Sequence, residues 1–185
     1  MTESRIEARI RELGYELPVA PAPVAAYVPA VTSGSYVYTS GQLPFVDGAL
    51  PETGKVSDSG AEGFVTPEDA KKYAGICLLN ALAAAKSVIG DLDRVQRVVK
   101  VVGFVASEVN FTAQPAVING ASELLGEIFG EAGQHARSAV GVPVLPLESP
   151  VEVESIGEYV ESGHRRSAAV CYSCCPSSAG SAGCS

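Results

Sequence analysis

The stretch RVQRVVKVVGFVAS, residues 94–107, limits the possible folds more than any other part of the chain. It is rich in β-branched residues and apolar along almost its whole length, which is typical of a strand. A strand with one face in water would alternate apolar and polar residues. We therefore expect this strand to be covered on both faces or to lie at a subunit interface.

Two helical patterns flank this strand. The first, residues 66–90, begins with Thr66 as N-cap and Pro67 at the first helical position, and it ends at Gly90. Many of its regularly spaced apolar residues are alanines, which permit close packing against a sheet. The second pattern, residues 114–130, carries larger apolar residues on one face.

Shorter apolar runs predict further strands. The runs at 27–31 and 36–40 flank a TSGS turn and predict a β-hairpin. The runs at 136–145 and 150–160 predict two more strands around a PLESP turn, and a short strand is expected near residues 45–46. This interleaved order predicts an α+β sandwich, with one mixed sheet and two main helices on one face.

We expect residues 1–161 to form one domain that opens with an extra amphipathic helix over 2–14. A proline-rich connector, residues 16–26, follows that helix. Residues 162–185 are small, polar and aperiodic, so we exclude them from the fold as a disordered tail or an expression-derived extension.

Composition and charge exclude several classes of function. Residues 1–161 hold 11 Lys and Arg against all 21 Asp and Glu, a balance of −10, and no basic stripe interleaved with aromatic residues appears. Such a surface repels a phosphate backbone, so no nucleic-acid partner is expected. No apolar run approaches the roughly 20 residues of a membrane span, and the charged N-terminus has no secretory hydrophobic region. We predict a cytoplasmic protein with no membrane partner.

Few residues could carry nucleophilic or metal chemistry. The chain has only two histidines, His135 and His164, and no Ser–His–Asp series, P-loop or GxGxxG at a strand–helix junction. Cys77 stands alone in a helical run and is expected to be a small buried hydrophobe. The other four cysteines lie within 171–184 without a partner at zinc spacing, so no metal site is predicted.

Polar residues inside apolar strands are the remaining candidates. Arg137 opens a strand that is otherwise nearly free of charge. It could reach solvent or an acid, or its planar fork could bind a carboxylate bidentately. Glu152 and Glu154 alternate with valines, which indicates either a solvated face or one carboxylate placed in a pocket. Asn119 has low helix propensity and is either a satisfied amide or a ligand contact.

The spacing of these candidates bears on where a pocket lies. If the last two strands pair as a hairpin, Arg137 and Glu152 lie several residue pairs apart, or ~10–20 Å at ~3.3 Å per residue. That distance is wide for one small-ligand pocket within a single chain. We therefore expect a pocket between subunits, with contributions from two chains.

The segment TSGQLP, residues 39–44, ends a predicted strand. Gly41 allows another group to approach the backbone closely, and Pro44 cannot donate to a central ladder. The segment is either a plain strand exit or a place where a small ligand rests on an exposed N–H.

Several stretches taken together resemble the Rid family, also called YjgF or reactive-intermediate deaminases and also labelled endoribonuclease L-PSP. They are YVPAV, TSGQLP, VINGAS, ARSAVGVPVLPLESPVEVE and the alanine-rich helix. The resemblance covers roughly residues 20–160, and the order of TSGQLP before ARSAV, LP and VEVE is specific. The opening helix and the long VNFTAQPAVINGAS connection resemble a longer subgroup of the family.

The resemblance implies a chorismate-mutase-like fold with a six-stranded mixed sheet, assembled as a homotrimer with pockets in the clefts between subunits. Family members hydrolyse 2-imino acids and their enamine tautomers to 2-oxo acids and ammonia. The implied partner is a small carboxylate substrate, and neither a metal nor an organic cofactor is required.

The resemblance also implies roles for individual residues. Arg137 matches the arginine that holds the substrate carboxylate, and Glu152 matches the glutamate near the attacking water. Many members carry a cysteine at the position of Ala139, so a thiol takes no part here and the local substrate-binding pocket differs.

Four further positions match substrate-binding residues of the family. Gly41 matches the glycine whose backbone contacts the ligand, with Ser40 beside it. Tyr27 matches an aromatic pocket residue, and Asn119 matches the helix amide. The alternatives are a non-catalytic trimer that senses 2-oxo acids and a ribonuclease or translation inhibitor, which the acidic surface disfavours.

Overall fold

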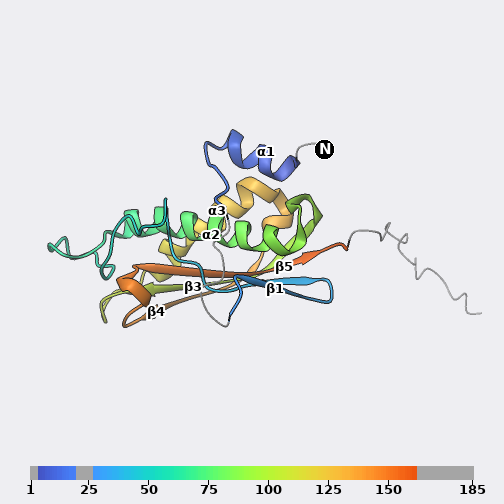
Figure 1. Ribbon diagram of the computed structural model, residues 1–185. Helices are drawn as coiled ribbons and strands as arrows, with labels where there is room; N and C mark the ends of the chain where they lie inside the picture. The colour runs from blue at the N-terminus through green and yellow to red at the C-terminus, as the bar shows by residue number, and fades with distance from the viewer. Residues whose placement is uncertain (1–3, 20–26, 162–185) are drawn as a thin grey trace, which may run out of the picture.

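The computed structural model describes residues 4–19 and 27–161, which form a mixed sheet with helices stacked on one face (Figure 1). Within them the sheet has five strands in the order β1-β2-β5-β3-β4. β3 and β4 run parallel, and the other neighbouring pairs are antiparallel. The strands are β1 Ala30–Ser33, β2 Tyr36–Thr39, β3 Val95–Ala106, β4 Ala136–Val142 and β5 Val151–Tyr159.

Helices α2 (Pro67–Ile89) and α3 (Gln114–Phe129) lie side by side on one face of the sheet. Thr66 caps α2 by accepting from the N–H of Asp69, and Gly90 ends the helix at φ 85°, as predicted. α2 is long and apolar enough to cross a membrane by length and composition alone, but most of it is buried inside the domain, as is typical of a core helix.

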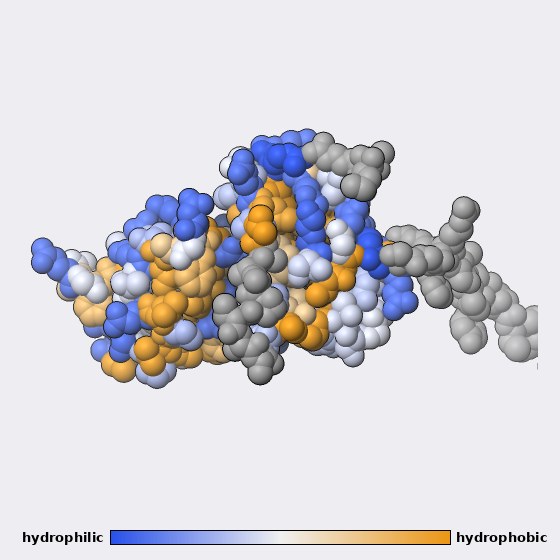
Figure 2. All heavy atoms as spheres, viewed as in Figure 1, coloured by the Kyte–Doolittle hydropathy of each residue, from blue (hydrophilic) through white to orange (hydrophobic). Residues whose placement is uncertain are grey.

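Helix α1 (Arg5–Glu12) lies on the outer side of the two main helices, and hydrophilic residues gather over it in Figure 2. It is shorter than the helix predicted over 2–14. Its N-terminus is capped by Asp93, a residue far away in sequence. The Asp93 carboxylate accepts hydrogen bonds from the N–H groups of Arg5 and Ile6 at 3.0 and 2.8 Å. Parts of the predicted connector at 16–26 and the whole tail at 162–185 lie outside the described residues.

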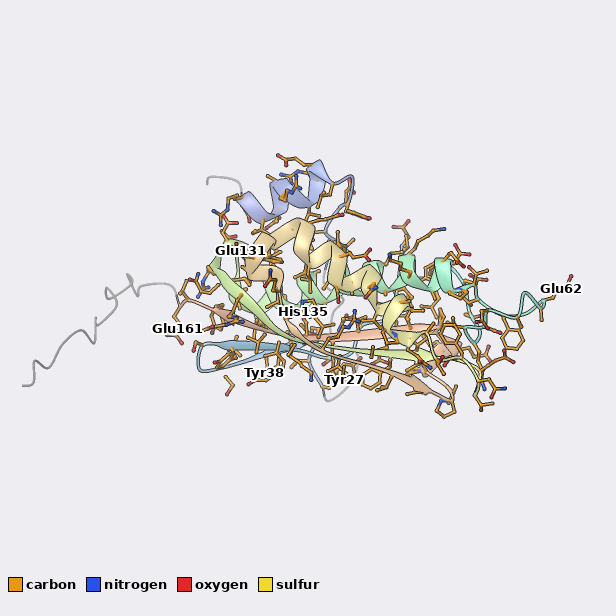
Figure 3. The ribbon with its side chains drawn as sticks, turned by 180° about the vertical axis from the view of Figure 1, so that it is seen from behind. Tyr27, Tyr38, Glu62, Glu131, His135 and Glu161 are labelled. Carbon is orange, nitrogen blue, oxygen red and sulfur yellow. The ribbon has the colours of Figure 1, made fainter. Side chains whose placement is uncertain are left out.

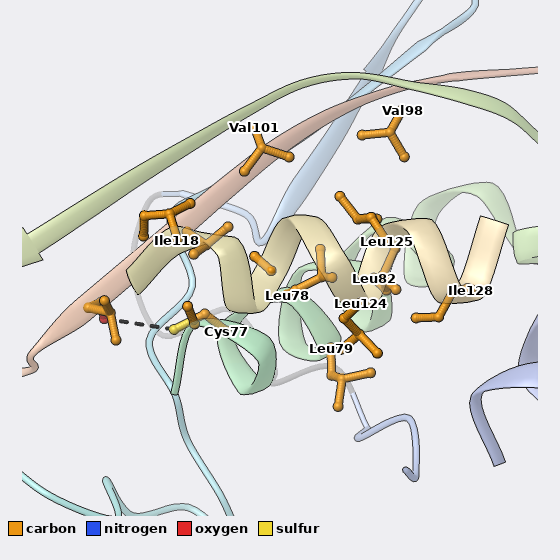
Figure 4. Packing of buried hydrophobic residues seen from close by; sticks show 14 of the residues in the cluster. Cys77, Leu78, Leu79, Leu82, Val98, Val101, Ile118, Leu124, Leu125 and Ile128 are labelled. Atoms are coloured by element: carbon orange, nitrogen blue, oxygen red, sulfur yellow. Dashed lines mark hydrogen bonds between the residues drawn. The ribbon is translucent and has the colours of Figure 1, made fainter. Parts of the chain in front are cut away.

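The core fills the layer between the helices and the sheet (Figure 4). Cys77 is fully buried there, and its Sγ lies 3.7 Å from the carbonyl oxygen of Val151. Burial raises the pKa of this thiol well above its usual value. The prediction of a small buried hydrophobe is confirmed.

Two expectations about strands were wrong. The sheet has five strands in the described residues instead of six, because the segment near Phe45 and Val46 forms only an isolated bridge between Val46 and Ala49. A tight turn closes that bridge, with Asp47 and Gly48 both at positive φ, and so the chain reverses before a strand can form.

The last two strands also do not pair as a hairpin, because β3 lies between β4 and β5. Along β3, Val101 and Val105 face the helices and are fully buried, while Val102 and Phe104 point to the other face and are only half-buried. This second face of the sheet, which we call the open face, carries no helix in the described residues. The continuous apolar run of β3 therefore fits the interface alternative better than burial on both faces within one chain.

Candidate active site

The first group of site residues surrounds Arg137 near the start of β4, one of the two edge strands. Arg137 pairs with the buried Val101, so its side chain points to the helix face of the sheet. Its Nη1 donates to Asn119 Oδ1 at 2.7 Å and to Ser122 Oγ at 3.1 Å, both on α3. The structure thus brings together Arg137 and Asn119, two residues selected from sequence.

The side chains that accept hydrogen bonds from the Arg137 guanidinium are neutral. No carboxylate of the described residues forms an ion pair with it. A shallow hollow of about 340 Å³ reaches the guanidinium and is lined by Ser122, Gly126, Gly133, Gln134, His135 and Arg137. A half-buried arginine that is fixed by an amide and a hydroxyl, but not neutralised, is suited to binding an external anion.

The second group lies where β2 ends, at TSGQLP. Tyr38 is the last residue of β2 that pairs with β5, and pairing resumes one residue out of register with Gln42 opposite Val153. Across this irregularity Thr39 Oγ1 accepts from the N–H of Ser155 at 2.9 Å. We find no acceptor for the N–H of Gly41 among the described residues. This N–H is available to a ligand or to solvent, which agrees with both the ligand-binding and the plain strand-exit interpretation.

Gly41 lies against the carboxylate of Glu152. A Cβ added to Gly41 would be 1.7 Å from Glu152 Oε1, so only glycine leaves room for this carboxylate. Burial, and then the neighbouring charge of Glu154, raise the pKa of Glu152 above its usual value. Glu152 is therefore a carboxylate whose charged form is disfavoured, as suits a group that exchanges a proton.

Ser40 and Tyr27 belong to this second group. The hydroxyl of Ser40 donates to the carbonyl oxygen of Val28 at 2.7 Å, which ties the strand exit to the residue after Tyr27. Tyr27 is 57% exposed and lies on the open face, as does Tyr38 (Figure 3). Ala139, in contrast, packs against the core from the helix face, whereas Gly41 lies against Glu152.

The two groups do not meet within one chain. Arg137 pairs with Val101 and Glu152 pairs with Phe104, three residues further along β3, or about 10 Å. They also stand two strands apart, about 10 Å in the other direction. Successive side chains along a strand point to opposite faces of the sheet. Because the β3 partners of Arg137 and Glu152 are three residues apart, these two side chains point to opposite faces. The spacing predicted from a hairpin was thus derived from the wrong pairing, yet the separation is real.

Three residues near the two groups were not selected from sequence. Asn80 of α2 donates to the carbonyl oxygens of Leu43 and Phe45 at 2.8 and 3.2 Å and so fixes the chain just after Gly41. Ser122 and His135 stand beside Arg137. A polar residue among apolar ones in the helix was a signal for Asn80, and proximity to ARSAV was a signal for His135.

A family model described as "YjgF/chorismate_mutase-like, putative endoribonuclease" matches residues 7–159. The chain belongs to this family. Its helix-covered mixed sheet is the α+β fold expected from the resemblance.

Known relatives agree with this assignment. Protein TCP17 of Trypanosoma cruzi is 42% identical over 159 residues, which are 85% of this chain and 96% of that protein. A 2-iminobutanoate/2-iminopropanoate deaminase of Dermatophagoides farinae is 31% identical over 75% of this chain and 90% of its own length. The crystal structure of Atu1372 from Agrobacterium tumefaciens, a protein of unknown function, has a TM-score of 0.75 and 43% identity over 84% of this chain and 93% of that one.

Proposed function

We propose that this protein is a hydrolase that converts small 2-imino acids and their enamine tautomers to 2-oxo acids and ammonia. The observation that carries the proposal is the guanidinium of Arg137, which is held by Asn119 and Ser122 and has no ion-pair partner among the described residues. The deaminase name of the relative from Dermatophagoides farinae supports the same reaction.

In this mechanism the substrate carboxylate binds Arg137, and the imine carbon is placed near Glu152 of a neighbouring protomer. The imine reacts in its protonated form, and Glu152 in its ionised form accepts a proton from water as the water oxygen bonds to that carbon and the C=N electron pair moves to nitrogen. Glu152 then gives this proton to the amine nitrogen of the carbinolamine. It accepts the hydroxyl proton as the C=O bond forms and the carbon–nitrogen bond breaks, so ammonia leaves, the 2-oxo acid remains and the last proton passes to solvent. The raised pKa of Glu152 makes its carboxylate a better base for the first step. The free N–H of Gly41 donates to the substrate beside this carboxylate.

The open face supports assembly into a trimer. It exposes four large hydrophobic side chains by 38–49%: Val31, Tyr36, Tyr38 and Val140. Such a surface is typical of a protein interface. In a closed ring each interface takes different surfaces from its two protomers, so the Arg137 group of one protomer can meet the Gly41 and Glu152 group of the next.

Mixing two inactive variants tests both parts of the proposal. We expect Arg137→Ala and Glu152→Gln each to lower kcat/KM by roughly 10²–10³-fold on freshly generated 2-iminobutanoate, measured as 2-oxobutanoate release. If the variants are co-expressed in equal amounts and assemble at random, about a quarter of the interfaces receive both intact groups, so about a quarter of the activity returns.

The matched control mixes Glu152→Gln with the double variant, which leaves no intact Glu152 and should stay inactive. Equal inactivity of both mixtures would refute the shared site. A wild-type protein that binds 2-oxobutanoate but releases none from the imine would instead be the non-catalytic sensor. RNA cleavage that survives purification and disappears in Arg137→Ala would favour the ribonuclease.

A further inference from the structure

A chain of hydrogen bonds joins His135 to Arg137 on the helix face of the sheet. His135 Nδ1 lies 2.6 Å from the carbonyl oxygen of Gly133, and its Nε2 lies 3.0 Å from Ser122 Oγ. Ser122 Oγ in turn accepts from Arg137 Nη1 at 3.1 Å. Figure 3 shows His135 on the side of the sheet that faces α3, away from Tyr27 and Tyr38.

The direction of each bond follows from chemistry. The carbonyl oxygen of Gly133 can only accept, so His135 Nδ1 carries a proton. In the neutral ring Nε2 is then an acceptor, and the hydroxyl proton of Ser122 points to it. The lone pairs of Ser122 Oγ are left to face Arg137. His135 thus sets the orientation of a hydroxyl that it shares with the guanidinium.

The guanidinium is held so that one edge stays available. Nη1 has two N–H groups, and Asn119 and Ser122 use both. The edge formed by Nε and Nη2 has no partner in the described residues, and two parallel N–H groups match a carboxylate bidentately. Without the histidine, the hydroxyl of Ser122 would turn to a carbonyl of the preceding helical turn, as serine in helices does.

We infer that His135 is a positioning residue, which acts through Ser122 to hold the Arg137 guanidinium ready for a carboxylate. It does not touch the substrate in this assignment. The inference rests on the proposed function for the identity of the carboxylate, and it assigns a role that the sequence comparison with the family did not give.

The backbone around His135 is built for this contact. A Cβ added to Gly133 would lie 2.3 Å from the carbonyl oxygen of Leu125, so the 3₁₀ turn Gly130–Gly133 packs against α3 only because residue 133 is glycine. That packing sets His135 opposite Ser122. The hollow of about 340 Å³ beside them leaves the guanidinium accessible from solvent.

Three variants test the inference: His135→Leu, Ser122→Ala and His135→Gln. The first measurement is the Kd of 2-oxobutanoate by calorimetry, which does not depend on turnover. We expect His135→Leu and Ser122→Ala each to weaken binding by about 5–15-fold, close to the net effect of one lost hydrogen bond. His135→Gln, whose side-chain oxygen can accept from Ser122, should stay within about threefold of wild type.

Two further readouts separate positioning from simple stability. KM on the imine should rise with Kd while kcat changes by less than about twofold, because binding is lost equally in the ground and transition states. In a Ser122→Ala background, His135→Leu should add nothing, because the link between the residues is already cut.

The outcomes for the inference and for the proposed reaction can be told apart. An unchanged Kd in His135→Leu would overturn the inference, as would a His135→Gln variant that binds 2-oxobutanoate as weakly as His135→Leu. Either result leaves the proposed reaction standing. Binding that depends on His135 without any imine turnover would refute the reaction and support the inference. A wild-type protein that neither binds 2-oxobutanoate nor turns over the imine would refute both.

Discussion

The two groups of site residues treat charge in opposite ways. Around Arg137, neutral side chains from α3 accept hydrogen bonds from the cation, and nothing in the described residues neutralises it. Around Glu152, burial and the negative charge of Glu154 disfavour the anion. One group is therefore prepared to receive an anion, whereas the other is prepared to take up and release a proton.

The groups also differ in what builds them. The Arg137 group depends on side chains that hold one another, so its geometry can be disturbed gradually by removing single hydrogen bonds. The Gly41 and Glu152 group depends on the absence of a side chain, because the carboxylate occupies the space of a missing Cβ. We expect the second group to respond to substitution more abruptly than the first.

Gly41→Ala is the variant that should break the second group most completely. The new Cβ would lie 1.7 Å from Glu152 Oε1, so the carboxylate must leave its position. We expect kcat on 2-iminobutanoate to fall by about 10–100-fold. A crystal structure of the variant should show Glu152 turned away from residue 41.

Gly75→Ala is the matched control for this prediction. Gly75 lies within α2 and is not among the residues that line the hollow beside Arg137, and an added Cβ would meet its nearest atom, the carbonyl oxygen of Gly120, at an ordinary contact distance of 3.6 Å. This variant should keep its kcat and gain up to about 1 kcal/mol of helix stability. Equal activity of Gly41→Ala and Gly75→Ala would contradict the role of the close contact.

The sequence predicted the main elements well because their signals are local. Caps at Thr66 and Gly90 and the apolar run of residues 94–107 specify α2 and β3 without reference to the rest of the chain. Strand order depends on contacts between distant segments, and no local signal showed that β3 separates β4 from β5.

The candidate site was predictable only in part for the same reason. Arg137 and Glu152 were noticeable as charges in apolar strands, but their opposite faces follow from register along β3. Ala139 was selected by resemblance alone, and the structure packs it against the core. Ser122 carried no signal of its own, and His135 was marked only by its proximity to Arg137, because the roles of both follow from hydrogen bonds made after folding.

A second prediction concerns the pH dependence of the Glu152 group. If the ionised carboxylate is the active form, kcat/KM should fall as pH drops through a pKa that lies above that of an exposed glutamate. Glu154→Gln removes one of the two causes of the raised pKa, so the acidic limb of the pH–rate profile should move to lower pH. Glu158→Gln, further along β5, is the control and should leave the limb in place. A limb that does not move in Glu154→Gln would show that burial alone sets the pKa.

The smallest predicted effect is on stability, and it separates the two groups most clearly. An acid whose pKa is higher in the folded state than in the unfolded state binds its proton more tightly when folded. Its ionisation therefore destabilises the fold as pH rises from the pKa of the unfolded state through the pKa of the folded state. The full destabilisation is present above the pKa of the folded state. Glu152→Gln should thus raise Tm at pH 8, by on the order of 1–3 °C, although it strongly lowers kcat/KM. Below pH 4 the gain should disappear, because the glutamate is then protonated in both states.

Arg137→Ala removes two hydrogen bonds but no group whose ionisation destabilises the fold, so its Tm should fall or stay level at both pH values. Scanning calorimetry of the two variants at pH 4 and pH 8 measures this contrast, and a lower Tm for Glu152→Gln at pH 8 would mean that its carboxylate stabilises the fold instead of being held there for chemistry.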